Sequence, residues 1–121
     1  MTGDIDIFYE RTPANTGRLF QALEEFWNGD IPGIGNPGEL QEDDMTLQFG
    51  RPPNRIDLIS ELSAVEFSEA WSDRTTAVMD VNGTVVQAHF IGINQLIANK
   101  ESVGRPKDLD DLRFLRRARG G

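Results

Sequence analysis

The chain has 121 residues, of which 38% are apolar and 26% charged, and its formal net charge at pH 7 is −8. These values are typical of one soluble globular domain with a modest core, so we expect residues 1–121 to form a single domain. The negative charge argues against a nucleic-acid-binding surface over the whole protein. No apolar run reaches the roughly 18 residues of a membrane span and no secretory leader is recognisable, which predicts a cytoplasmic protein with no membrane partner.

The absence of cysteine limits the groups that are available for catalysis and for metal binding. The sequence contains no cysteine and one histidine, His89. Disulfides and thiolate chemistry are therefore excluded, and a zinc site is disfavoured because zinc in proteins prefers Cys and His ligands. Any bound metal is expected to be a hard ion, Mg²⁺ or Mn²⁺, held by oxygen atoms. A lone histidine in a predicted strand is more typical of a packing residue than of a catalyst.

The first half of the chain predicts a strand, a helix and two further strands. Residues 4–9 alternate apolar and polar side chains as a strand does. The Thr-Pro pair at 12–13 is typical of a helix start, and the helix should bury one apolar face. That face comprises Leu19, Phe20, Leu23, Phe26 and Trp27. Residues 29–44 are rich in Gly and Pro and predict a loop, and strands are expected at 45–49 and 55–59.

The second half predicts helices around a hairpin. Ser63 and Glu66 have the spacing of a capping box that opens a short helix. Residues 75–90 form two alternating segments around Asn82-Gly83, which indicates a hairpin on a type I′ turn. A break is expected at Gly104. Helices are expected on either side of it, near 93–100 and 107–117. The order of elements predicts an α+β fold, a mixed β-sheet with helices packed against it.

Three aspartates in the predicted strands are candidates for chemistry. Asp4 and Asp6 alternate with isoleucines in the first strand, and Asp57 interrupts the otherwise apolar strand that ends at Ile59. If these strands are neighbours in register, three carboxylates meet on one surface, where repulsion raises their pKa values unless a cation is present. Two interpretations stay open: a site for divalent metal ions, or an acidic strand face in water.

Lys100 is a second candidate, because it lies three residues after Ile97 and seven after Ile93 and so ends the apolar stripe of its helix. Its ammonium either reaches solvent near the helix C-terminus or points inward to a phosphate. From Lys100 onward the chain has seven basic and four acidic residues, which suits a helix C-terminus or a phosphate-facing patch. Asp108 and Asp111 fit the first turn of a helix.

In this order the segments DID, RIDLI and NKESVGRPKDLDDL resemble the minimal nucleotidyltransferases of the DNA polymerase β superfamily. They are more closely similar to the small bacterial nucleotidyltransferases that include antitoxin-type and AbiEii-type members of toxin–antitoxin modules. The resemblance runs from Gly3 to about Leu115. It implies metal-dependent transfer of a nucleoside monophosphate from an NTP to a hydroxyl acceptor.

The resemblance also implies roles for particular residues. It assigns Mg²⁺ or Mn²⁺ binding and catalysis to Asp4, Asp6 and Asp57, one of which would assist deprotonation of the acceptor. It assigns contact with the nucleotide phosphates, or their positioning, to Lys100 and Asp108.

The sequence departs from these families at its start. They carry, ahead of the aspartate pair, a helix that opens with Gly-Gly or Gly-Ser and binds the triphosphate through backbone N–H groups. Only Met1, Thr2 and Gly3 precede Asp4, so we expect an N-terminally truncated fold that is inactive as this chain alone. Enzymatic activity is therefore left open. The alternative is a non-catalytic binding or interaction protein, antitoxin-like or self-associating, with a nucleotide or a protein as partner. The missing helix should also uncover apolar surface on the first strand, which predicts a homo-oligomer.

Overall fold

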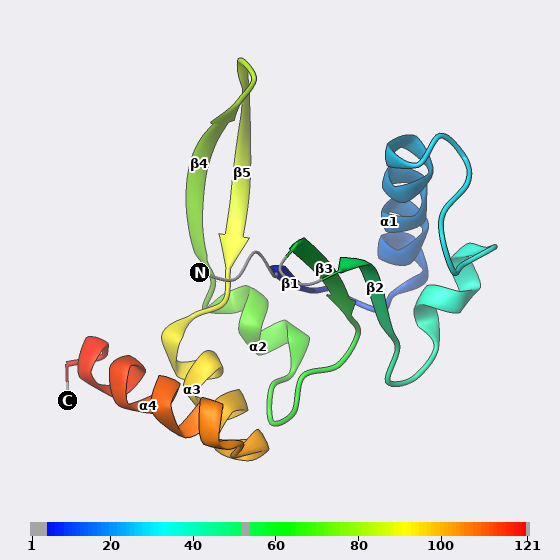
Figure 1. Ribbon diagram of the computed structural model, residues 1–121. Helices are drawn as coiled ribbons and strands as arrows, with labels where there is room; N and C mark the ends of the chain where they lie inside the picture. The colour runs from blue at the N-terminus through cyan, green and yellow to red at the C-terminus, as the bar shows by residue number, and fades with distance from the viewer. Residues whose placement is uncertain (1–4, 52–53, 121) are drawn as a thin grey trace. The chain divides into compact units, whose positions relative to one another are not determined.

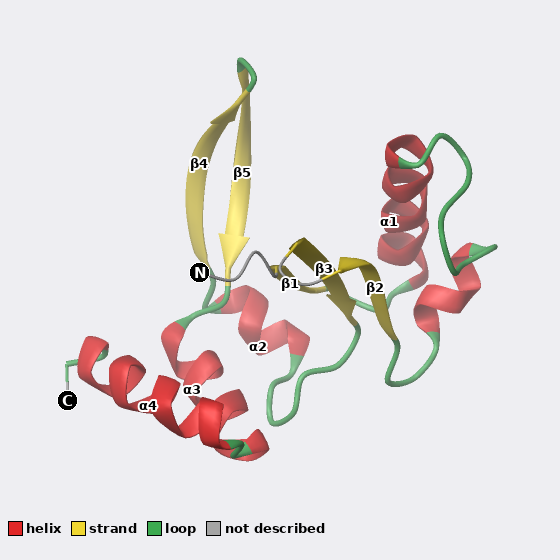
Figure 2. Ribbon diagram, viewed as in Figure 1, coloured by secondary structure: helices red, strands yellow, loops and turns green. Residues whose placement is uncertain are grey.

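The computed structural model describes residues 5–51 and 54–120, and its elements follow the predicted order (Figures 1 and 2). The fold is mixed α and β, which confirms the predicted α+β class. Its internal contacts divide the chain into two compact units, which we call unit 1 (Met1–Glu61) and unit 2 (Leu62–Gly121). The expectation of a single domain stays a prediction.

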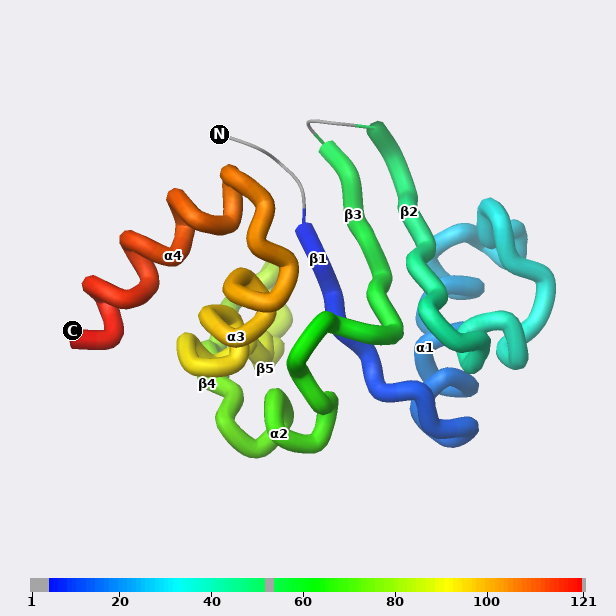
Figure 3. The backbone as a smooth tube through the Cα atoms, turned by 90° about the horizontal axis from the view of Figure 1, so that it is seen from below, coloured from blue at the N-terminus to red at the C-terminus, as the bar shows by residue number. Residues whose placement is uncertain are grey.

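Unit 1 is built on a three-stranded mixed sheet in the order β1-β3-β2 (Figure 3). Strand β1 (Ile5–Phe8) runs parallel to β3 (Asn54–Ile59), and β2 (Thr46–Arg51) runs antiparallel to β3. The register places Asp6 opposite Asp57. Two aspartates that are far apart in the sequence are therefore neighbours across the sheet.

One face of this sheet carries the core of unit 1. Side chains alternate between the two faces of a strand, so every second residue of β2 and β3 lies on this face. The buried residues of this core are Tyr9, Ile31, Ile34, Leu40, Leu47, Phe49 and Leu58. Helix α1 (Pro13–Phe26) packs against them through Leu19, Phe20, Leu23 and Trp27. The expectation that Phe26 is buried is wrong, since it is 74% exposed. It ends the helix and lies with its ring edge against Trp27, which itself contacts Phe49.

Helix α1 begins as predicted. Thr12 accepts a hydrogen bond from the backbone N–H of Asn15 (3.2 Å), and Pro13 is the first helical residue. The segment predicted as a loop contains a short 3₁₀ helix, η1 (Pro37–Gln41). Its Leu40 is fully buried, and the carbonyl of Leu40 accepts a hydrogen bond from the Tyr9 hydroxyl (2.7 Å). Burial of Leu40 and its hydrogen bond with Tyr9 therefore attach this Gly- and Pro-rich segment to the core.

Gly50 lets β2 approach β3 closely. Its φ is +86°, and a Cβ at this position would lie 2.5 Å from the backbone oxygen of Asn54. No L side chain fits there, so glycine is required at this position. In the same strand pairing Gln48 lies opposite Asp57.

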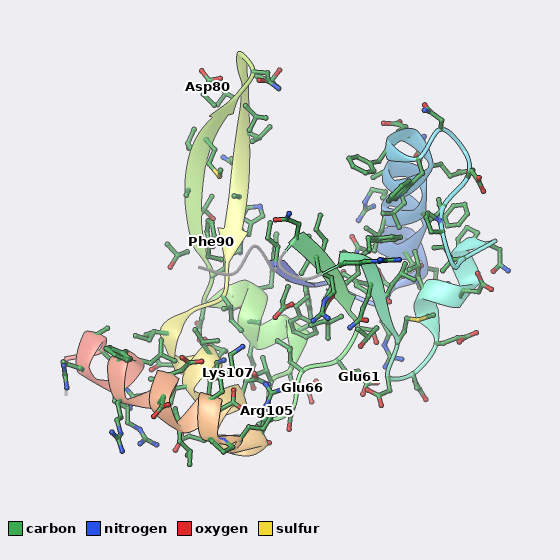
Figure 4. The ribbon with its side chains drawn as sticks, viewed as in Figure 1. Glu61, Glu66, Asp80, Phe90, Arg105 and Lys107 are labelled. Carbon is green, nitrogen blue, oxygen red and sulfur yellow. The ribbon has the colours of Figure 1, made fainter. Side chains whose placement is uncertain are left out.

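Unit 2 contains the predicted hairpin. Strands β4 (Thr75–Val81) and β5 (Thr84–Phe90) pair antiparallel around Asn82 and Gly83, both of which have positive φ. These are the bounds and the turn expected for a type I′ hairpin. Figure 4 shows Asp80 at the tip of the hairpin and Phe90 at its base.

Three helices complete unit 2. They are α2 (Phe67–Ser72), α3 (Ile93–Val103) and α4 (Pro106–Ala118). Gly104 ends α3 in the left-handed conformation (φ +66°) that glycine adopts readily. The chain breaks here as predicted, although α3 continues to Val103, beyond the predicted end near residue 100. The predicted capping box is wrong: the N-cap of α2 is Glu66, and the hydroxyl of Ser63 instead contacts that of Ser102.

No helix among the described residues has both the length and the apolar character needed to cross a membrane.

Candidate functional site

The first candidate site lies on the sheet face opposite the core of unit 1. Asp6 on β1 and Asp57 on β3 are direct partners across parallel strands, and Gln48 on β2 is the next partner in the same row. Directly opposite side chains of neighbouring strands lie on the same face. Asp6 is exposed, whereas Asp57 is only 7% exposed. A buried carboxylate therefore has a second, solvated carboxylate beside it.

Arg55 is the cationic partner of Asp57. It lies two residues earlier on β3 and hence on the same face. Its Nε lies 3.0 Å from Oδ1 of Asp57, and its Nη2 donates a hydrogen bond to Oδ2 (3.3 Å). The Nε contact is close enough for an ion pair but is not aligned as a hydrogen bond, because Oδ1 of Asp57 is buried without a hydrogen-bond donor in the described part of the chain. Asp57 thus keeps unused acceptor capacity.

The donor atoms at Asp6 and Asp57 are of the type that suits a hard divalent cation. Both residues supply carboxylate oxygens from adjacent strands, and oxygen atoms are the ligands that Mg²⁺ and Mn²⁺ prefer. Asp4, the third member of the predicted set, lies outside the described residues. Within 5–51 and 54–120, no three His, Asp or Glu side chains are grouped closely enough to hold a metal ion.

The second candidate site lies in unit 2, where α3 meets α4. Asp108 in the first turn of α4 is fully buried. Its Oδ2 accepts hydrogen bonds from the backbone N–H (3.2 Å) and Nε (2.8 Å) of Arg105. Its Oδ1 accepts from Nζ of Lys100 (3.3 Å) and Nη2 of Arg105 (3.4 Å). Figure 4 labels Arg105 and Lys107 at this junction. Every oxygen of Asp108 is therefore satisfied.

Lys100 connects two carboxylates of α4. Its Nζ lies 3.3 Å from Asp108 and 3.0 Å from Asp111, and its side chain is 20% exposed. The ammonium is directed to these two carboxylates and not to open solvent, and the predicted contact with a phosphate stays a prediction. It joins the end of α3 to the start of α4.

The electrostatics of this cluster favour full ionisation. The hydrogen bond from Arg105 lowers the pKa of Asp108 to about 2, against the raising effect of burial, with a further contribution from Lys100. Burial alone would lower the pKa of Lys100, but the hydrogen bonds to Asp111 and Asp108 outweigh it and the pKa is raised. Both groups are therefore charged at neutral pH, and each stabilises the other's charged form.

His89 is exposed, and its contacts are with two neighbouring side chains. Its ring meets that of Trp71 edge-on at 4.7 Å between centroids, and its Nδ1 lies 3.1 Å from Oγ1 of the cross-strand residue Thr76.

Arg55 and Arg105 are the two site residues that the sequence interpretation did not single out. A signal was present for both: Arg55 precedes Asp57 by two residues in a strand, and Arg105 precedes Asp108 by three at a helix start. These spacings place the side chains together only once the strand and the helix start are located.

A family model described as a nucleotidyltransferase of unknown function (DUF6036) matches residues 1–115. The predicted resemblance to a minimal nucleotidyltransferase family is thereby confirmed. No curated protein and no solved structure matches the chain.

Proposed function

The chain belongs to the family of nucleotidyltransferases of unknown function (DUF6036), and from this premise we propose that its site serves metal-dependent transfer of a nucleoside monophosphate from an NTP to a hydroxyl acceptor. The observation that carries the proposal is the pairing of Asp6 with Asp57 on parallel neighbouring strands, together with the buried oxygen of Asp57 that has no hydrogen-bond donor in the described chain. A purely structural carboxylate is normally satisfied when it is buried.

In the proposed reaction the acceptor oxygen forms a bond to the α-phosphorus of the NTP. The bond from that phosphorus to the bridging oxygen breaks, and pyrophosphate leaves with the bonding electrons. Asp6 and Asp57, with Asp4, would hold Mg²⁺ or Mn²⁺, which supplies charge stabilisation to the phosphates. One of these carboxylates takes the hydroxyl proton, and the low exposure of Asp57 limits access of competing water to it.

Lys100 is proposed as a phosphate contact and Asp108 as the residue that positions it. An ammonium has three N–H donors. Two of them are directed to Asp108 and Asp111, which leaves one for a phosphate oxygen. The raised pKa of Lys100 keeps it positively charged over the neutral range, as a phosphate contact requires.

Mn²⁺ binding tests the proposed site without depending on turnover. The chain, Asp6→Asn and Asp57→Asn are titrated with Mn²⁺, and free Mn²⁺ is followed by electron paramagnetic resonance. Both substitutions are expected to weaken binding at least tenfold, because each removes a carboxylate ligand. Asp30→Asn is the matched control, since it removes an exposed carboxylate outside the strands of the same unit. Equal affinities in all four proteins would contradict the proposal.

Nucleotide transfer is then measured with each labelled NTP and Mn²⁺. Label on an acceptor that disappears in Asp57→Asn but persists in Asp30→Asn supports catalysis. Tight metal binding without label in any protein would instead support the non-catalytic alternative for this chain.

A second candidate function, self-association, is favoured by the exposed edge of unit 1. Strand β1 is an edge strand of its sheet, and its Ile5 and Ile7 are 55% and 44% exposed. An edge strand with apolar side chains offers both unpaired backbone groups and apolar surface to a second copy. This agrees with the predicted homo-oligomer, in which the first strand lies at the interface.

Light scattering over a hundredfold dilution tests the association. We expect a mass above the 13.5 kDa of one chain, reduced to that value by Ile7→Lys. Val85→Lys is the control, because Val85 is an apolar side chain of the hairpin that is 70% exposed. Loss of the oligomer in Val85→Lys alone would place the interface on the hairpin and refute a role for β1.

A further inference from the structure

Arg55 occupies the position of a cation in the carboxylate site. Its guanidinium contacts both oxygens of Asp57, through Nε and Nη2. The side chains of the pair are 29% and 10% exposed, respectively, so most of each lies away from water. One guanidinium therefore neutralises a carboxylate whose strand neighbour, Asp6, is also negative. The pair of aspartates keeps a net negative charge even with Arg55 in place.

The contact is poorly made for a permanent structural ion pair. A guanidinium and a carboxylate bind best through two parallel, aligned hydrogen bonds. Here only Nη2 donates an aligned hydrogen bond (3.3 Å), and the Nε contact is not aligned, so Nε of Arg55 and Oδ1 of Asp57 are buried without a hydrogen bond to each other. Such atoms retain part of their desolvation cost.

We propose that Arg55 is the resident counter-ion of the site: it competes with the divalent cation for Asp57 and, once displaced, binds the polyphosphate of the nucleotide. This inference rests on the proposed function. The displaced guanidinium stays on the same strand face as Asp6 and Asp57, where a metal-bound polyphosphate would lie. Its planar set of donors suits phosphate oxygens. The residue thus couples metal entry to nucleotide binding.

The proposal predicts effects of opposite sign in one variant. Arg55→Gln should bind Mn²⁺ about fivefold more tightly, which corresponds to about 1 kcal/mol, because no ion pair has to be broken. The same variant should bind the complex of Mn²⁺ with inorganic tripolyphosphate about fivefold more weakly, since the guanidinium is gone. Free Mn²⁺ is followed by electron paramagnetic resonance and tripolyphosphate binding by calorimetry.

Two further variants separate competition from general charge. Arg51→Gln removes the same charge from an exposed position on the other face of the sheet, and both affinities should stay within about twofold of the parent. Arg55→Lys keeps the positive charge but lacks the planar set of N–H donors of the guanidinium. Its Mn²⁺ affinity should therefore lie between those of the parent and Arg55→Gln. It also carries the test if Arg55→Gln fails to fold, as judged by circular dichroism.

The outcomes distinguish this inference from the proposed function. If the parent binds Mn²⁺ and Arg55→Gln binds it equally or more weakly, Arg55 is a structural partner only, and the metal site stands. If the parent binds no Mn²⁺, the proposed function and this inference fail together. If the Mn²⁺ affinity rises but tripolyphosphate binding is unchanged, Arg55 competes with the metal but does not contact the phosphates, and the second half of the proposal is wrong.

Discussion

The two units differ in charge and in how each treats its buried aspartate. Unit 1 contains twelve acidic and four basic residues and thus holds the whole net charge of −8, whereas unit 2 has eight of each. Each unit buries one carboxylate: Asp57 is 7% exposed and Asp108 is fully buried. The acidic unit provides Asp57 with poorly aligned contacts to one arginine. The neutral unit surrounds Asp108 with aligned donors.

This difference indicates which carboxylate can bind a ligand. Oδ2 of Asp108 accepts from the backbone and the side chain of Arg105, and Oδ1 accepts from Lys100 and Arg105. No acceptor position is left for a cation, so Asp108 holds the α3–α4 junction and fixes Lys100. Asp57 has an unsatisfied oxygen beside a second carboxylate. Both Asp57 and Asp108 are buried, so burial does not distinguish them. They differ in whether each carboxylate oxygen accepts a hydrogen bond.

The largest effect is expected from Asp108→Asn. The substitution leaves Lys100 and Arg105 with a neutral partner and removes the charge that favours the helix N-terminus. We expect the midpoint of thermal unfolding, followed by circular dichroism, to fall on the order of 5 °C. Asp110→Asn, an exposed neighbour on the same helix, should leave it nearly unchanged. Similar midpoints for the two variants would show that the cluster does not stabilise α4.

The same pair of proteins has a predicted pH dependence. The pKa of Asp108 in the folded state is about 2, below its ordinary value of 3.8, because Arg105 donates a hydrogen bond to the carboxylate. Its stabilisation is therefore complete above pH 3.8 and is lost as the pH falls through about 2. The difference in unfolding midpoint between the parent and Asp108→Asn should stay constant from pH 7 to about pH 4.5 and shrink towards pH 2. A constant difference throughout would mean that the carboxylate charge does not contribute.

In the metal-free protein, Asp57→Asn should have a smaller effect than Asp108→Asn, and its larger effect should appear only when Mn²⁺ is present. Mn²⁺ at about 100 times its dissociation constant should stabilise the parent by about 2.7 kcal/mol. In the variant most of this gain should disappear. The metal-free protein should lose no more than about 1 kcal/mol, because the substitution changes one hydrogen bond and one unaligned contact with Arg55. Denaturant titrations with and without Mn²⁺ measure both quantities. A large metal-free loss would make Asp57 structural, like Asp108.

The smallest effect is expected from Asp111→Asn. Asp111 is 42% exposed and shares Lys100 with Asp108. Because such pairs contribute little in water, the free energy of unfolding should change by less than about 0.5 kcal/mol. Denaturant unfolding measures the change. A loss as large as that of Asp108→Asn would show that the Lys100 contacts, rather than those of Arg105, hold the junction.

Local patterns predicted most of the elements. The hairpin was located to the residue because Asn82-Gly83 allows the positive φ values that a type I′ turn needs. The start of α1 followed from a threonine cap and a proline, and the break between α3 and α4 followed from Gly104, although α3 ends later than predicted. The predictions were wrong where contacts between residues far apart in the sequence determine the local structure. The 3₁₀ helix η1 in a Gly- and Pro-rich segment depends on burial of Leu40 beneath Tyr9.

For the candidate site residues too, some features followed from local sequence patterns and others from long-range contacts. The sequence by itself determined that aspartates alternate in a strand, that Asp57 interrupts an apolar strand and that Lys100 ends an apolar helix stripe, since spacing along one element defines its faces. Only the tertiary structure decided that β1 and β3 are parallel neighbours with Asp6 opposite Asp57, and that Lys100 is held by Asp108 and Asp111. Register and helix–helix contact depend on interactions between distant segments. These interactions set which buried carboxylate has all its oxygens hydrogen-bonded and which keeps one oxygen without a hydrogen bond.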